Sequence, residues 1–264
     1  MTAPISKPNP PASPVKHPPS VRLGVLLYLG YLAIFFGTWG INGVDYNRIG
    51  ENAHTTKLWY AFPTLFGCAF LAVGLSILGW WRLVLFDRTR SGPRWIWILP
   101  VAMAGVIVHN FLGLPAGKLS AELLLWSSLG AVGVGFGEEM ITRGSLLVGL
   151  RSRFGENRVW FLSSLLFAAL HVPNVIFGFP LWAMPIQVAL TFVMGGGFYV
   201  IRRMSGTLLL PMALHGLWDS ALFLSVATEV EPSAIQFVIY PLSLVCTLAV
   251  VLRDRRNRAS GQTV

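Results

Sequence analysis

Eight long apolar stretches follow one another along the chain, separated by shorter polar segments. A helix that crosses a bilayer needs roughly 20 mostly apolar residues. The pattern therefore predicts an all-α, multi-pass integral membrane protein with about eight transmembrane helices, at residues 23–40, 58–81, 95–114, 121–150, 159–172, 181–201, 207–227 and 234–252. The fourth stretch contains several glycines and is either one long tilted helix or a short lead-in followed by a span. The fifth is short, and Pro173 disfavours its continuation.

Composition supports the same class of protein. Of the 264 residues, 54% are apolar and 12% are charged, and the mean hydropathy is +0.63. A soluble domain carries about 25% charged residues, so the lipid bilayer is the expected surrounding. Cys68 and Cys246 both lie inside apolar stretches, which predicts buried thiols rather than a disulfide framework or a metal motif.

The basic residues indicate how the chain is oriented. If the N-terminus is cytoplasmic, 16 lysines and arginines fall in cytoplasmic segments, and only Arg48, Lys57 and Lys118 fall on the opposite side. Lysine and arginine concentrate in cytoplasmic loops, so both termini are expected in the cytoplasm, with the protein in the cell membrane (the inner or plasma membrane in a bacterium). Because these residues would face anionic lipid headgroups, the net charge of +9 requires no nucleic-acid partner.

Charged residues in the fourth stretch interrupt an otherwise apolar run. Glu138, Glu139 and Arg143 are followed by apolar residues again, and charges at membrane depth are costly and usually functional. Glu139 and Arg143 are four residues apart and share a helical face, where they can pair. Glu138 lies about 100° around the helix and is free to face a cavity. A helix end in the headgroup region is the alternative interpretation.

Two histidines lie at a similar expected depth. His171 follows Phe167 by four residues, and His215 precedes Asp219 by four. Glu138, His171 and His215 each lie 12 or 13 residues from a cytoplasmic arginine, which places all three roughly 18–20 Å below that surface in straight helices. A histidine within a span often serves only as an interhelical hydrogen-bond partner. Three such groups in one layer favour a common site.

These motifs together resemble the CAAX protease and bacteriocin-processing family, which includes type II CAAX prenyl endopeptidases and lysostaphin-resistance-like proteins. The family pattern is Glu-Glu-x-x-x-Arg, then Phe-x-x-x-His, then His-x-x-x-Asn or Asp. The matching residues are Glu138, Glu139, Arg143, Phe167, His171, His215 and Asp219. The resemblance implies an eight-helix intramembrane endopeptidase with a catalytic cavity open to the cytosol.

Composition, the apolar stretches and the resemblance together divide the chain into five segments. They are a disordered Pro-rich cytoplasmic tail (1–20), N-terminal transmembrane helices (21–120), a catalytic membrane domain (121–227), a last transmembrane helix (228–252) and a basic cytoplasmic tail (253–264). The expected substrate is a membrane-associated protein, such as a prenylated one, or a small peptide.

The resemblance implies roles for the site residues. Glu138 would activate water as general base, His171 would orient that water, and His215 would stabilise the oxyanion. Glu139 and Arg143 would hold the helix face in place, with Phe167 supporting. Asp219 would be protonated, orient His215 or bind a metal.

Metal-free glutamate catalysis without a cofactor is the preferred prediction, because the chain has no His-Glu-x-x-His motif. A zinc site formed by Glu138, His171, His215 and Asp219 is the alternative. Two other functions compete with the protease. One is a non-enzymatic membrane scaffold or interaction protein with the same fold, and the other is a proton-coupled transporter, since buried Glu and His relay protons.

Overall fold

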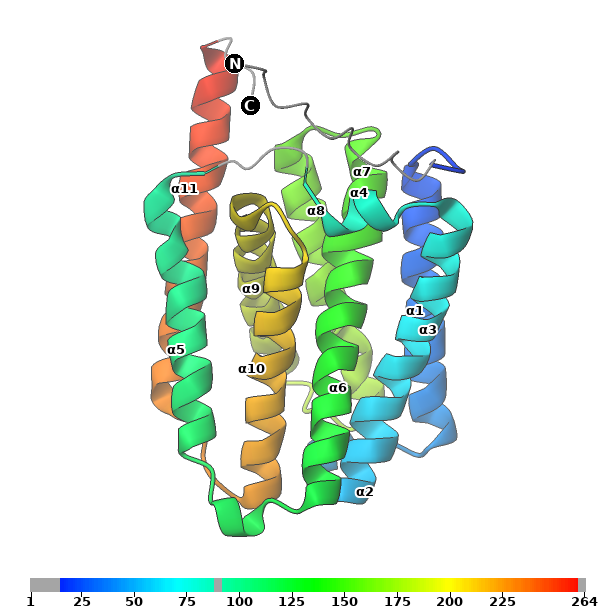
Figure 1. Ribbon diagram of the computed structural model, residues 1–264, viewed down its shortest axis with the longest axis vertical. Helices are drawn as coiled ribbons and strands as arrows, with labels where there is room; N and C mark the ends of the chain where they lie inside the picture. The colour runs from blue at the N-terminus through cyan, green and yellow to red at the C-terminus, as the bar shows by residue number, and fades with distance from the viewer. Residues whose placement is uncertain (1–14, 88–91, 261–264) are drawn as a thin grey trace, which may run out of the picture.

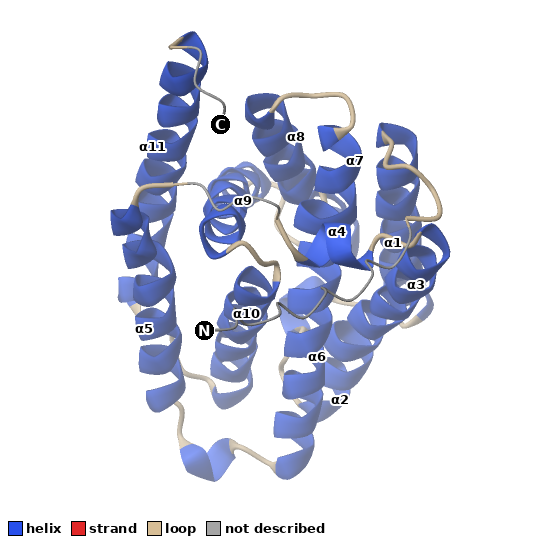
Figure 2. Ribbon diagram, turned by 45° about the horizontal axis from the view of Figure 1, so that its top comes forward, coloured by secondary structure: helices blue, strands red, loops and turns tan. Residues whose placement is uncertain are grey.

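The computed structural model describes residues 15–87 and 92–260. These segments form a bundle of long helices (Figure 1). Their secondary structure contains no strand, and Phe86 and Thr207 form an isolated β-bridge (Figure 2). Residues 1–14 of the Pro-rich tail and residues 261–264 of the basic tail lie outside the described residues.

The chain passes up and down the bundle through helices that in places change their winding. The first half comprises α1 (Val21–Ile41), η1 (Tyr46–Arg48), α2 (Ala53–Thr55), the π-helical segment η2 (Thr56–Ala61), α3 (Phe62–Leu78), α4 (Trp81–Leu85), η3 (Arg94–Trp97), α5 (Ile98–Leu112) and η4 (Ala116–Lys118). The second half comprises α6 (Ala121–Glu139), the π-helical segment η5 (Met140–Leu146), α7 (Leu147–Arg151), α8 (Glu156–Ala169), η6 (Val172–Phe177), α9 (Met184–Ser205), α10 (Leu209–Thr228), η7 (Ala234–Val238) and α11 (Ile239–Ala259).

All eight predicted stretches are helical. Within residues 15–87 and 92–260, seven helices are long and apolar enough to cross a membrane, which confirms an all-α, multi-pass integral membrane protein. The eighth, at 121–151, runs without a break through α6, η5 and α7. The fourth predicted stretch is therefore one long helical segment and not a short lead-in followed by a separate span. This segment is long enough to cross a membrane, but the charged residues near its centre lower its mean hydropathy. Its part from Met140 to Leu150 is buried by other helices.

Several helices begin or end at capping residues, so their bounds differ from the predicted ones. Ser20 and Ser120 cap α1 and α6, since each side chain accepts a hydrogen bond from a backbone N–H in the first turn. Gly79 and Gly206 end α3 and α9 in the left-handed conformation, with φ of 71° and 73°. The last helix continues to Ala259, beyond the expected end at residue 252, and the short helix α4 was not predicted.

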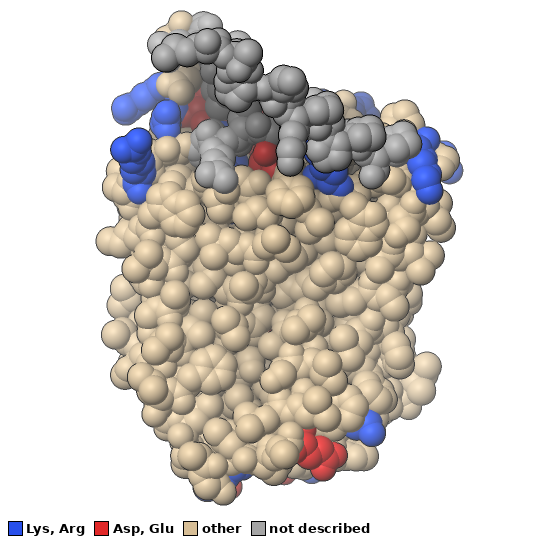
Figure 3. Space-filling model, viewed as in Figure 1, with Lys and Arg blue, Asp and Glu red and all other residues tan. Residues whose placement is uncertain are grey.

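The two ends of the bundle differ in charge. Helix α1 begins and α11 ends at the same end (Figure 1). On the face shown, Lys and Arg side chains gather at that end, and a wide belt free of charged side chains separates it from the other (Figure 3). We call the first the arginine-rich end; Arg151 and Arg202 belong to it. The opposite, arginine-poor end includes η1 and η4, with Arg48 and Lys118.

Helices α6 and α10 cross so closely that their backbones are in contact. A Cβ atom added at Gly135 would lie 2.2 Å from the carbonyl oxygen of Met212, and one added at Gly216 would lie 2.2 Å from that of Ala131. Small residues let membrane helices approach this closely. This crossing lies one residue from His215 and three from Glu138, so it brings the second histidine motif against the acidic motif.

Replacing Gly216 by Val is expected to separate α6 from α10, because backbone atoms leave no room for a side chain. Overpacking of this kind costs at least about 1–3 kcal/mol. We expect a lower thermal unfolding midpoint in detergent and a reduced yield of monodisperse protein. Gly105→Val on α5, where an added Cβ meets nothing within 4 Å, is the matched control. Equal stability of the two variants would contradict a tight crossing.

Candidate active site

Glu138 and Glu139 lie at the end of α6, where the α-helical winding gives way to the π-helical segment η5. Both carboxylates are buried. Glu139 pairs with Arg143 one turn further along, with Nη1 of Arg143 2.9 Å from Oε1 of Glu139. The predicted ion pair is therefore present, buried inside the bundle and away from either end of the continuous helical segment 121–151.

Arg143 is held between aromatic rings. Its guanidinium carbon lies 3.8 Å from the centre of the Phe167 ring and 5.5 Å from that of Phe198, which favours a cation electrostatically. Gly195 on α9 leaves room for it, because an added Cβ would approach Nη2 to 3.0 Å. Nη2 and Nε have no hydrogen-bond partner among the described residues, so Glu139 is the carboxylate that compensates this charge.

His215 meets both glutamates. Its Nδ1 lies 2.9 Å from Oε1 of Glu139, and its Nε2 lies 3.9 Å from Oε2 of Glu138. Because a carboxylate oxygen paired with arginine accepts hydrogen bonds, Nδ1–H donates to Glu139 and Nε2 points at Glu138. The Phe198 ring stacks on the imidazole, with centres 4.7 Å apart. Glu139 thus orients the catalytic candidate His215 as well as pairing with Arg143.

Asp219 and His171 complete the predicted set. Oδ2 of Asp219 lies 4.0 Å from Nε2 of His215, so the direct hydrogen bond that orients His215 comes from Glu139 instead. His171 follows α8, and its Nδ1 lies 3.0 Å from the carbonyl oxygen of Phe167. Nδ1–H is therefore the donor, which leaves Nε2 available as an acceptor.

Two adjoining cavities meet at these residues. The smaller, of about 80 Å³, is lined by Glu138, His171 and Asp219, and the larger, of about 560 Å³, by His171, His215 and Asp219. The structure therefore brings the motif residues together: His171 and Asp219 line both cavities, Glu138 the smaller one and His215 the larger one. Glu139, Arg143 and Phe167 support them.

Sequence reasoning missed three side chains beside this space. Gln187 on α9 donates from Nε2 to the Tyr46 hydroxyl at 3.0 Å, and Asn174 donates to Gln187 Oε1 at 3.4 Å. Both Tyr46 and Gln187 line the larger cavity. Gln187 is an amide side chain in a largely apolar stretch, which is a signal of the kind that marked the histidines.

The zinc alternative receives no support from the geometry. In the part of the chain that the structure describes, no group of three or more His, Cys, Asp or Glu side chains could hold a metal ion. A zinc site needs at least three such ligands converging on one point.

Comparison of the sequence with known proteins and protein families gives one match. A comparison with curated proteins finds no match to this chain. The family model described as type II CAAX prenyl endopeptidase Rce1-like matches residues 120–221. That range contains every residue of the predicted site and nearly coincides with the expected domain at 121–227. The match confirms the resemblance that the motifs carry: in residues 120–221, this chain is similar to the type II CAAX prenyl endopeptidases of the Rce1-like family.

Proposed function

We propose that this protein is an intramembrane endopeptidase that hydrolyses a peptide bond of a membrane-associated protein or peptide, with Glu138 as general base. The observation that carries the proposal is the 3.9 Å separation of Glu138 Oε2 from His215 Nε2 at the border of a cavity. This distance is too long for a direct hydrogen bond, so both side chains can bind one water that lies beside the line joining them. The similarity of residues 120–221 to CAAX prenyl endopeptidases supports the same reaction class.

Each polar group has a task in hydrolysis. Glu138 takes a proton from the water as it attacks the carbonyl carbon, and His171, through Nε2, orients that water. His215 donates from Nε2–H to the oxyanion when the imidazole carries both protons, and Glu139 holds the ring through Nδ1. Oxyanion donors are typically worth about 3–4 kcal/mol. Glu138 then returns its proton to the leaving amine.

The proposed location follows from the arginine-rich end. Since cations concentrate on the cytoplasmic side, we place that end, where α1 begins and α11 ends, at the cytoplasmic face of the cell membrane. Prenylated proteins belong to the substrates suggested by the family name. Small membrane peptides are the second class.

Purified protein in lipid vesicles tests the proposal directly. We expect new termini in a panel of prenylated and membrane-spanning peptides, detected by mass spectrometry, and we expect the same cleavage rate after dialysis against a chelator. A rate that falls with chelator and returns with zinc would overturn metal-free catalysis. Absence of cleavage across the panel, with cellular phenotype preserved in a Glu138→Ala/His171→Ala variant, would instead support a non-enzymatic scaffold.

A further inference from the structure

Tyr46 lies where the two cavities meet, although it belongs to the short helix η1 between α1 and α2 and not to a long helix. Four described residues line both cavities: Tyr46, His171, Asp219 and Phe223. Two of them, His171 and Asp219, come from the sequence motifs. Tyr46 is therefore a neighbour of the proposed reaction centre to which neither the motifs nor the mechanism gives a task.

Contacts on two sides fix the Tyr46 ring. Its centre lies 4.9 Å from that of Phe179 and 6.0 Å from that of Trp39, both in edge-to-face geometry, which aromatic pairs favour. Asn47, the next residue, donates from Nδ2 to the carbonyl oxygen of Gly178 at 2.8 Å. This hydrogen bond ties η1 to the segment between η6 and α9. The ring is therefore held in place over the cavities despite its position in a connecting segment.

Two amide side chains orient the Tyr46 hydroxyl. Asn174 donates to Oε1 of Gln187 at 3.4 Å, so Nε2 is the Gln187 atom that faces Tyr46, and it donates to the hydroxyl oxygen at 3.0 Å. A phenol both accepts and donates. Since its oxygen accepts from Gln187, the Tyr46 O–H proton remains to be donated, and no described residue accepts it.

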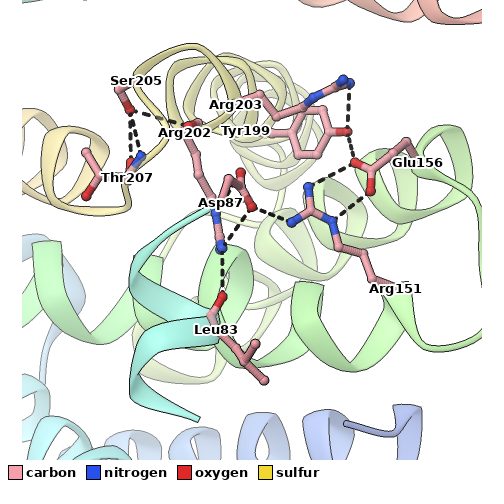
Figure 4. Close-up of polar contacts among 9 residues, drawn as sticks. All are labelled: Leu83, Asp87, Arg151, Glu156, Tyr199, Arg202, Arg203, Ser205 and Thr207. Carbon is pink, nitrogen blue, oxygen red and sulfur yellow. Dashed lines mark hydrogen bonds and ion pairs between the residues drawn. The ribbon is translucent and has the colours of Figure 1, made fainter. Parts of the chain in front are cut away.

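The Tyr199 hydroxyl, at the arginine-rich end, shows what a complete set of partners looks like. It accepts from Nη1 of Arg203 and donates to Oε2 of Glu156 at 2.6 Å (Figure 4). Tyr46 has the counterpart of the first contact, from Gln187, and lacks the second. The acceptor for its proton therefore has to come from what occupies the cavities.

The proton stays on Tyr46 at neutral pH. Desolvation raises the pKa of this hydroxyl, and the negative charges of Asp219 and Glu138 act in the same direction, whereas the hydrogen bond from Gln187 opposes them. His171 already donates its Nδ1 proton to a backbone carbonyl. Among the four residues common to both cavities, Tyr46 is thus the one with a neutral donor to offer.

We propose that Tyr46 is a further substrate-binding residue, whose hydroxyl donates a hydrogen bond to a backbone carbonyl oxygen of the bound peptide where the two cavities meet. Gln187 is the positioning residue that orients this hydroxyl. The inference rests on the proposed function, because it takes a peptide as the ligand. A peptide in this mostly apolar space gives up its hydrogen bonds to water, and an unpaired carbonyl there costs free energy. The placed donor therefore favours a peptide over a hydrocarbon chain, which offers no acceptor.

Binding without turnover tests the inference. A fluorescently labelled prenylated peptide is titrated against the Glu138→Gln protein in vesicles, with and without Tyr46→Phe, which keeps the ring and removes only the hydroxyl. We expect Kd to rise about three- to tenfold, the usual worth of one neutral hydrogen bond, with an unchanged unfolding midpoint. Tyr28→Phe is the matched control, because Tyr28 lines neither cavity and donates to the carbonyl oxygen of Leu166. Its Kd should stay within twofold.

A double variant tests the role of Gln187. Gln187→Leu should also raise Kd, and combining it with Tyr46→Phe should add nothing, because Gln187 acts through the hydroxyl. Additive losses would overturn the positioning role. An unchanged Kd in Tyr46→Phe, or no binding of the peptide at all, would overturn the inference. Cleavage by the parent protein is scored separately, so binding that responds as expected without cleavage would contradict the proposed function alone.

Discussion

Glu138→Gln is expected to reduce peptide cleavage by about 10²–10⁴-fold, the usual contribution of a positioned general base. The amide has nearly the shape of the carboxylate but cannot take the proton of the attacking water. Because Glu138 makes no ion pair with arginine in the described structure, the variant should keep the wild-type unfolding midpoint. The measurement is kcat for a cleaved peptide in vesicles, beside a thermal unfolding curve in detergent.

Glu122→Gln is the matched control, since Glu122 is an exposed carboxylate in the first turn of the same helix. Its kcat should stay within twofold of the wild type. A Glu138→Gln protein that cleaves within tenfold of the wild-type rate would remove the general base from the proposed mechanism. The site would then require a different proton acceptor.

Glu139→Ala should be the most destabilising change at the site. It leaves the Arg143 guanidinium buried without its carboxylate, and breaking a buried pair in this way costs about 3–5 kcal/mol. It also removes the acceptor of His215 Nδ1–H. We therefore expect a large drop in unfolding midpoint together with a loss of cleavage. Glu51→Ala, which breaks the exposed pair with Arg48, should change stability by no more than about 1 kcal/mol.

A double variant separates the two roles of Glu139. Glu139→Ala combined with Arg143→Leu removes the unpaired charge, so stability should recover in part. His215 still lacks its partner, so kcat should remain low. Recovery of both stability and cleavage would show that Glu139 serves only to neutralise Arg143, and that the orientation of His215 does not depend on it.

The helical class and the order of the long apolar helices followed from hydropathy because a chain in lipid has to satisfy its backbone hydrogen bonds within each helix. Depth was predictable for the same reason. Counting residues from Arg151 and Arg203 placed Glu138 and His215 in one layer, and their side chains lie 3.9 Å apart. A helix rises by a fixed amount per residue, so sequence distance converts directly into depth.

Rotation about the helix axis was less predictable. Glu138 and Glu139 are neighbours, and which of them contacts His215 directly depends on how α6 and α10 turn toward each other. The glycine crossing at Gly135 and Gly216 sets that rotation, and hydropathy alone does not reveal it. The shape of the site also depends on long-range packing, here of Arg143 between Phe167 and Phe198.

The backbone contact between α6 and α10 has a mechanical consequence. With no side chains between the two backbones at Gly135 and Gly216, neither helix can slide or tilt without a clash. Glu138 and His215 are therefore carried by one rigid unit. Changes at Ile186, which lines the larger cavity from α9, should therefore leave the Glu138–His215 pair intact.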